Sequence, residues 1–167
     1  FFDEKLHTFE DVAFNFVFLK HTEKILFLKK CLYNHLVHDN YASASLKIGA
    51  NPESLFGYRA AMAKAREFLL GCGLEADDVQ RAVGHAYTCY TIIQLIRMCG
   101  QLNDENQTAI YAFVKNLVNE GPLADSVRFY APSKGDSRIL PILFKLKCVR
   151  TILMVCRYKA QQRYRRK

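Results

Sequence analysis

Three side chains that can bind metals lie close together near residue 35. Cys31, His35 and His38 are spaced so that they share one face of a predicted helix. Structural zinc sites use thiolate and imidazole ligands, but they need four, and this spacing matches none of the usual patterns. A buried thiol beside two imidazoles near a helix end explains the same residues without a metal. We therefore predict no metal site and no cofactor.

A second group of reactive side chains lies between residues 81 and 89. His85 and Cys89 are four residues apart, so they would touch on a helix as a nucleophilic cysteine–histidine pair does. No basic neighbour or helix N-terminus is evident that would activate the thiol. Arg81 and His85 resemble the arginine–histidine pair of HEPN-type helical ribonucleases, but that motif has more than the three intervening residues found here. We predict that His85 and Cys89 pack in the interior of the protein.

The remaining polar patterns also favour a protein without catalytic residues. The acidic pairs at residues 77–78 and 104–105 occur where helices are predicted to begin, and carboxylates stabilise that end of a helix. The glycines at 71 and 73 are followed by Glu75, whose charge would repel a phosphate. The sequence therefore predicts neither an enzyme nor a site for a small-molecule substrate.

Helical periodicity extends over most of the chain, and the predicted class is all-α. We expect about five helices, packed as an irregular bundle or as the terminal part of a helical solenoid. Residues 39–51 and 122–136 lack periodicity and are predicted loops, the second with a short extended piece at 127–130. A phenylalanine-rich stretch, residues 14–19, could also form a strand. The expected helices cover residues 8–38 (one kinked helix or two short ones), 52–70, 75–100 and 103–120, and a last helix begins at residue 139 and continues into the basic C-terminal residues.

Three helices have a predicted buried stripe. In the helix over residues 103–120 it consists of Ile110, Phe113, Val114, Leu117 and Val118. The third helix is expected to pack through Val79, Val83, Ala86, Tyr90 and Ile93. In the last helix, apolar residues alternate at spacings of three and four, which predicts one long helix with a narrow apolar seam hidden against the other helices or a neighbouring chain. That seam consists of Ile139, Ile142, Leu146, Val149, Leu153, Cys156 and Ala160.

Positive charge is concentrated at the C-terminus. Residues 1–136 carry 14 Lys and Arg against 16 Asp and Glu, whereas residues 137–167 carry 10 and no acid. We predict a single helical domain over residues 1–156 and a basic tail, residues 157–167, that continues the last helix. This tail could bind nucleic acid, an acidic protein or a membrane surface, or remain solvated. The residues predicted to contact nucleic acid or an acidic partner are Arg157, Lys159, Arg163, Tyr164, Arg165, Arg166 and Lys167.

Four phenylalanines near the N-terminus are the predicted protein interface. Phe9, Phe14, Phe16 and Phe18 are more numerous than one helix face can bury, and aromatic residues are enriched in interface cores. The scattered single cysteines indicate an intracellular protein, and no apolar run is long enough to span a membrane. We predict a non-catalytic protein-interaction module, a fragment or subunit of a larger assembly with other protein chains as partners. The alternative is an RNA-binding helical domain that uses the basic C-terminal helix.

Overall fold

The computed structural model describes residues 6, 8–26, 28–30 and 52–164, and within these residues it contains helices and no strands. The predicted all-α class is confirmed. The described residues form seven helices, more than the five expected, because two short helices lie in segments predicted as a loop and as part of a longer helix. They are α1 (Glu10–Leu19), α3 (Pro52–Gly71), α4 (Ala76–Gly100), α5 (Gln107–Asn119), α6 (Gly121–Val127), α7 (Ile139–Lys145) and α8 (Val149–Tyr164).

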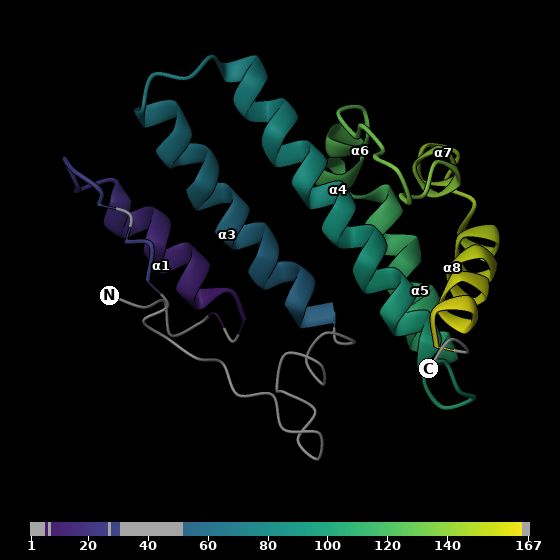
Figure 1. Cartoon of the computed structure of the whole chain (residues 1–167). Coiled ribbons are helices and arrows are strands. Elements are labelled where there is room, and N and C mark those ends of the chain that lie inside the picture. Colours follow the sequence, from purple (N-terminus) through teal and green to yellow (C-terminus); the bar gives the residue numbers. More distant parts are fainter. Residues whose placement is uncertain (1–5, 7, 27, 31–51, 165–167) are drawn as a thin grey trace.

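The helix α4 lies at the centre of the molecule. Figure 1 shows α1, α3 and α4 side by side, with α5 to α8 gathered on the other side of α4. There α4 packs on α6 and α8, while α5 and α7 each contact both of those helices. The main core therefore lies between α4 and the C-terminal helices, and it includes Leu95, Met98, Val114, Leu123, Leu140 and Ile152.

The predicted buried stripe of α4 is only partly correct. Val79 is buried, but Ile93 is exposed, and Val83, Ala86 and Tyr90 are half-buried. Because α4 has neighbours on both sides, it buries a wider surface than a helix on the outside of a bundle. Three of the residues that it buries instead are polar, namely Thr88, Thr91 and Gln94. The others include Tyr87, Ile92, Leu95, Met98 and Cys99.

The turn between α3 and α4 follows the local signals of the sequence. Pro52 is the first residue of α3, where its missing N–H is not needed. At the other end, Gly73 adopts a left-handed conformation (φ 81°). The backbone N–H groups of Gly73 and Leu74 donate to the carbonyls of Leu70 and Leu69, which is the pattern of a Schellman motif. The chain reverses there and brings α4 antiparallel to α3.

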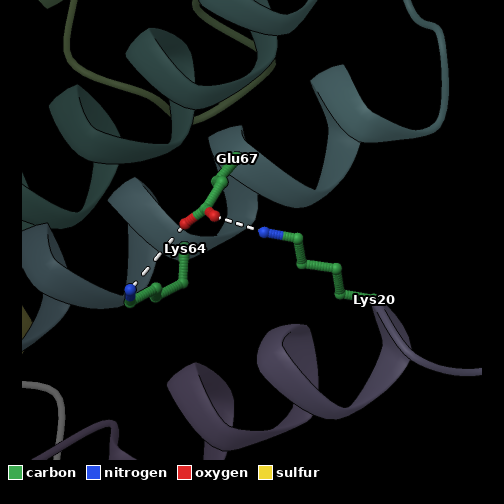
Figure 2. Close-up of polar contacts among 3 residues, drawn as sticks. All are labelled: Lys20, Lys64 and Glu67. Atoms are coloured by element: carbon green, nitrogen blue, oxygen red, sulfur yellow. Dashed lines mark hydrogen bonds and ion pairs between the residues drawn. The ribbon is translucent and has the colours of Figure 1, made fainter.

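The first helix is held on α3 by a close backbone contact. A Cβ atom placed on Gly57 would lie 2.5 Å from the carbonyl oxygen of Thr8, so only glycine permits this approach. At the other end of α1, the ammonium group of Lys20 donates to the carboxylate of Glu67 on α3, which Lys64 also approaches (Figure 2). The hydrogen bond and charge of Lys20 lower the pKa of Glu67.

The N-terminal helix is shorter than predicted. Residues 14–19 are helical, so the alternative of a strand is wrong, but α1 ends at Leu19. The following described residues form no helix, and Ile25 and Leu28 are exposed. The rest of that predicted helix lies outside the described residues.

The predicted helix 103–120 corresponds to α5. Four residues of its predicted stripe, Ile110, Val114, Leu117 and Val118, are buried, and Phe113 is half-buried. The loop predicted after it is wrong in its first part, because residues 121–127 form α6. Pro122 lies in the first turn of that helix, a position that tolerates proline. The glycine–proline pair therefore marks a change of helix direction rather than the start of a loop.

The predicted single long helix from residue 139 into the basic tail is wrong, because the chain divides there into α7 and α8. Lys147 adopts a left-handed conformation (φ 54°). Its N–H donates to the carbonyl of Phe144, and that of Cys148 donates to Leu143, so α7 ends in a Schellman motif without glycine. The break rotates the first half of the seam out of the core. Val149, Cys156 and Ala160 are buried, whereas Ile139, Ile142 and Leu146 are exposed, and α7 buries Leu140, Pro141 and Phe144 instead.

Candidate functional site

An open cleft lies between α4, the loop over residues 130–137, and α8. Its volume is about 780 Å³, within the range of ligand sites. It combines an apolar floor from α4 with aromatic, acidic, basic and amide side chains. The lining residues are Cys89, Ile92, Ile93, Ile96, Tyr130, Gly135, Asp136, Ser137, Tyr158, Lys159 and Gln162.

The cysteine of this cleft contacts His85, as the spacing of the two residues predicts. The Sγ atom of Cys89 lies 3.5 Å from Nε2 of His85. The other ring nitrogen, Nδ1, accepts a hydrogen bond from the backbone N–H of Ala131 over 3.2 Å. In the neutral imidazole the proton is therefore on Nε2, facing the sulfur. His85 is oriented to donate to Cys89 and not to remove its proton.

The thiol of Cys89 is not activated by its surroundings. Burial and the charge of Asp136 raise its pKa, which is opposite to what a nucleophilic cysteine requires. Arg81 lies away from the cleft on the exposed side of α4, 3.9 Å from the carboxylate of Asp78. Neither Asp136 nor Arg81 therefore activates the thiol of Cys89.

Tyr130 connects the histidine to the cleft. Its ring stacks on the imidazole of His85 with centroids 5.6 Å apart. Burial and the charges of Asp136 and Cys89 raise its pKa to about 12. The phenol is neutral at physiological pH, and Tyr130 also lines the cleft.

No model of a known protein family matches the sequence, and neither a curated protein nor a solved structure matches the chain.

The four N-terminal phenylalanines do not form one surface. Phe9 packs edge-on against Tyr58 and Tyr90, with centroids 5.0 and 5.1 Å away. Phe16 lies against Phe68 of α3, and Phe14 stacks on Phe18. Of these four residues Phe18 alone is exposed, with 59% of its surface accessible to solvent. Two of the four predicted interface residues thus contribute to contacts between α1 and its neighbours in the fold.

The predicted basic tail is partly embedded in the fold. Arg157 is exposed, whereas Lys159 is half-buried and lines the cleft. Ala160 is buried against the other helices, so the packing of α8 continues beyond residue 156. The backbone of Arg163 and Tyr164 belongs to the last turn of α8. Arg165, Arg166 and Lys167 lie outside the described residues.

An exposed apolar surface on α7, which we call the α7 ridge, was missed at the level of sequence. It consists of Ile139, Ile142 and Leu146, which are 57%, 58% and 64% exposed. Their spacing of three and four residues places them on one side of the helix. Leu140 and Phe144 have a helical spacing of four and are equally apolar, which was the signal for the alternative face that is in fact buried.

The α7 ridge is surrounded in sequence by unpaired positive charge. Arg138, Lys145, Lys147 and Arg150 are all exposed. The ion pairs found within the described part of the chain involve other cations, on α1, α3 and α4. The surface around α7 therefore combines apolar side chains with cations that have no acidic partner there.

The residues that we considered as possible metal ligands, Cys31, His35 and His38, all lie outside the described residues. Elsewhere, in the part of the chain that is described, no three His, Cys, Asp or Glu residues are grouped so that they could hold a metal ion.

Among the described helices, none is both long and apolar enough to cross a membrane.

Proposed function

We propose that this protein is a non-catalytic interaction module that binds an acidic, amphipathic helix of another protein on the α7 ridge. The observation that carries this proposal is the exposure of Ile139, Ile142 and Leu146 on one side of a short helix. Large aliphatic side chains grouped in this way often mark interaction sites. Burying each of them in an interface would contribute about 1 to 2 kcal/mol.

The charge around the ridge indicates the chemistry of the partner. From residue 137 to the C-terminus the sequence contains ten Lys and Arg and no acid. The cations nearest to the ridge in sequence, Arg138, Lys145 and Lys147, are exposed and unpaired within the described residues. An acidic partner would approach faster and with the correct orientation because of this field. Helices that bind apolar surfaces use anchors at the same three- and four-residue spacings.

Affinity capture from cell extract, followed by mass spectrometry, tests the proposal with matched variants. Replacing the central anchor, Ile142→Ser, removes exposed apolar surface and should leave the fold intact. The same replacement at another exposed apolar residue, Leu74→Ser, is the control. Leu74 belongs to the turn between α3 and α4, and that turn lies away from α7 (Figure 1). We expect Ile142→Ser to lose a set of acidic proteins that Leu74→Ser retains.

Charge-reversal variants and lipid vesicles distinguish binding of an acidic protein from binding of a membrane surface. The double variant Lys145→Glu with Lys147→Glu should lose the same partners, and capture should weaken as the salt concentration rises. If wild type and Ile142→Ser capture identical proteins, the proposal is wrong. Binding to vesicles of anionic lipid that depends on Ile142 would instead make the ridge a membrane-surface contact.

A second candidate function is RNA binding through the end of α8. The observation that favours it is the Tyr158 ring, which is 62% exposed beside Arg157 and Lys159. Exposed aromatic rings next to cations stack with unpaired bases. Deleting residues 157–167 would be a poor test, because it removes the buried Ala160. The paired substitution Arg157→Gln with Tyr158→Ala should instead abolish binding to a single-stranded RNA oligonucleotide.

A further inference from the structure

We propose that the cleft between α4 and α8 binds a nucleotide, with the base against Tyr130 and Tyr158 and the phosphate at Lys159. This site is separate from the α7 ridge, and neither proposal depends on the other. The cleft brings together residues from three parts of the chain, and together they provide an aromatic platform, a polar edge and a single cation.

The aromatic part of the site comes from two elements that face the same cleft. Tyr130 belongs to the loop after α6, and one side of its ring is already covered by His85. Tyr158 belongs to α8, and its ring remains mostly exposed. The isoleucines of α4 that line the cleft provide apolar surface for a flat, weakly polar ring. A nucleobase stacks favourably on side chains of this kind.

The polar edge of the cleft can recognise N–H groups of a base. One carboxylate oxygen of Asp136 accepts a hydrogen bond from the backbone N–H of Ser133 over 2.7 Å, and this bond orients the side chain. Its second oxygen has no hydrogen-bond partner among the described residues. Gln162, across the cleft, has an amide that can donate and accept. Guanine presents N–H donors along one edge, so it fits a carboxylate acceptor better than uracil does.

The phosphate would lie at the one cation that lines the cleft. Lys159 is half-buried, and it forms no ion pair with the described residues. A half-buried ammonium group interacts more strongly with an anion than a fully exposed one, because solvent screens it less. The single carboxylate and single ammonium of the cleft match a ligand with a donor edge at one end and a negative charge at the other.

The test is an NMR titration of the full chain with guanosine 5′-monophosphate as the probe. We expect amide shifts at Ile96, Tyr130 and Lys159. Tyr158→Ala should weaken binding about tenfold, the loss of one stacking contact. Lys159→Gln should flatten the dependence of Kd on salt concentration. Tyr111→Ala is the matched control, since Tyr111 is an exposed tyrosine on α5 outside the cleft.

Two further probes, a single-stranded RNA and inorganic phosphate, separate the sources of the ligand and can overturn the proposal. Binding of a single-stranded guanosine-containing RNA more tightly than the mononucleotide, with the same response to Tyr158→Ala, would identify RNA as the source. Equal affinity would identify a free nucleotide, and both results support the site. Inorganic phosphate that shifts the same residues with the same affinity would overturn it, as would shifts confined to residues outside the cleft or none at millimolar concentration.

Discussion

The backbone N–H of Ala131 donates a hydrogen bond to Nδ1 of His85 over 3.2 Å, and this contact determines the role of the imidazole. Since Nδ1 accepts, the neutral ring carries its proton on Nε2, which faces the Sγ atom of Cys89 at 3.5 Å. A base for a nucleophilic thiol would need a free lone pair on that nitrogen. His85 therefore fixes the orientation of the Cys89 side chain, which lines the cleft. This agrees with the binding role that we propose for the cleft.

Thiol reactivity provides the first prediction. Cys72 and Cys148 are exposed, whereas burial and Asp136 raise the pKa of Cys89. Cys156 is fully buried, and a hydrogen bond with Cys99 together with burial raises its pKa further. Alkylation at neutral pH, followed residue by residue by mass spectrometry, should modify Cys72 and Cys148 first, then Cys89, and Cys156 only on unfolding.

Faster labelling of Cys89 than of Cys72 would contradict this order. It would mean that the sulfur is present as a thiolate, and catalysis by the pair with His85 would again have to be considered.

The second prediction concerns the residue that separates α7 from α8. Lys147 has a left-handed backbone conformation, which costs a residue with a side chain about 1–2 kcal/mol and glycine much less. Part of that gain is lost because glycine increases the entropy of the unfolded chain. Lys147→Gly should raise the free energy of unfolding by about 0.5 to 1 kcal/mol in urea denaturation.

The control for this prediction is the same replacement inside a helix. Arg157→Gly, at an exposed position within α8, should lower the free energy of unfolding by about 1 kcal/mol. If both variants are destabilised equally, α7 and α8 are not separated by a left-handed residue.

The third prediction tests the attachment of α1 to α3. In Gly57→Ala, the new methyl group would lie 2.5 Å from the carbonyl oxygen of Thr8, so α1 must move away from α3. We expect a loss of about 1–3 kcal/mol in the free energy of unfolding, as for other overpacked sites. In Gly57→Ala, amide hydrogen exchange should become faster than in wild type, and more so in α1 than in α4.

Gly71→Ala is the matched control, because its methyl group would have no atom within 4 Å other than its chain neighbours and the nearby backbone of its own helix. Alanine is the better helix former at the end of α3, so this variant should be neutral or slightly more stable. Destabilisation of both variants to the same extent would mean that Thr8 does not contact Gly57.

The fourth prediction follows from the phenol of Tyr130, whose pKa is raised from 10.0 to about 12. Between these values the folded protein keeps a proton that the unfolded chain releases. The contribution of this group to stability is therefore complete below pH 10 and is lost as the pH rises toward about 12. The difference in phenolate absorbance between wild type and Tyr130→Phe during an alkaline titration measures this pKa.

Burial is the largest cause of the raised pKa of Tyr130, and the charge of Asp136 is the next. Asp136→Asn should therefore lower this pKa without restoring its ordinary value. An unchanged titration in Asp136→Asn would show that the carboxylate of Asp136 does not face Tyr130. Asp136 would then not belong to the polar edge of the cleft.

Local signals in the sequence were sufficient for the helices that begin and end at strong markers. Pro52 and Gly73 delimit α3, and the apolar residues of α5 face the core as their spacing predicts. The spacing of His85 and Cys89 also predicted their contact. Such features depend on residues within a few positions of one another, so periodicity and turn chemistry determine them.

Tertiary packing decided the features for which the sequence allowed two solutions. Ile139 and Ile142 could form one buried face and Leu140 and Phe144 another, and contacts of α7 with α6 and α8 selected the second. That choice requires Lys147 in a left-handed conformation, which no local signal favours. The cleft joins Cys89, Tyr130 and Lys159 across some seventy residues of sequence. Periodicity within a single helix cannot predict such a meeting, because it depends on how several helices pack together.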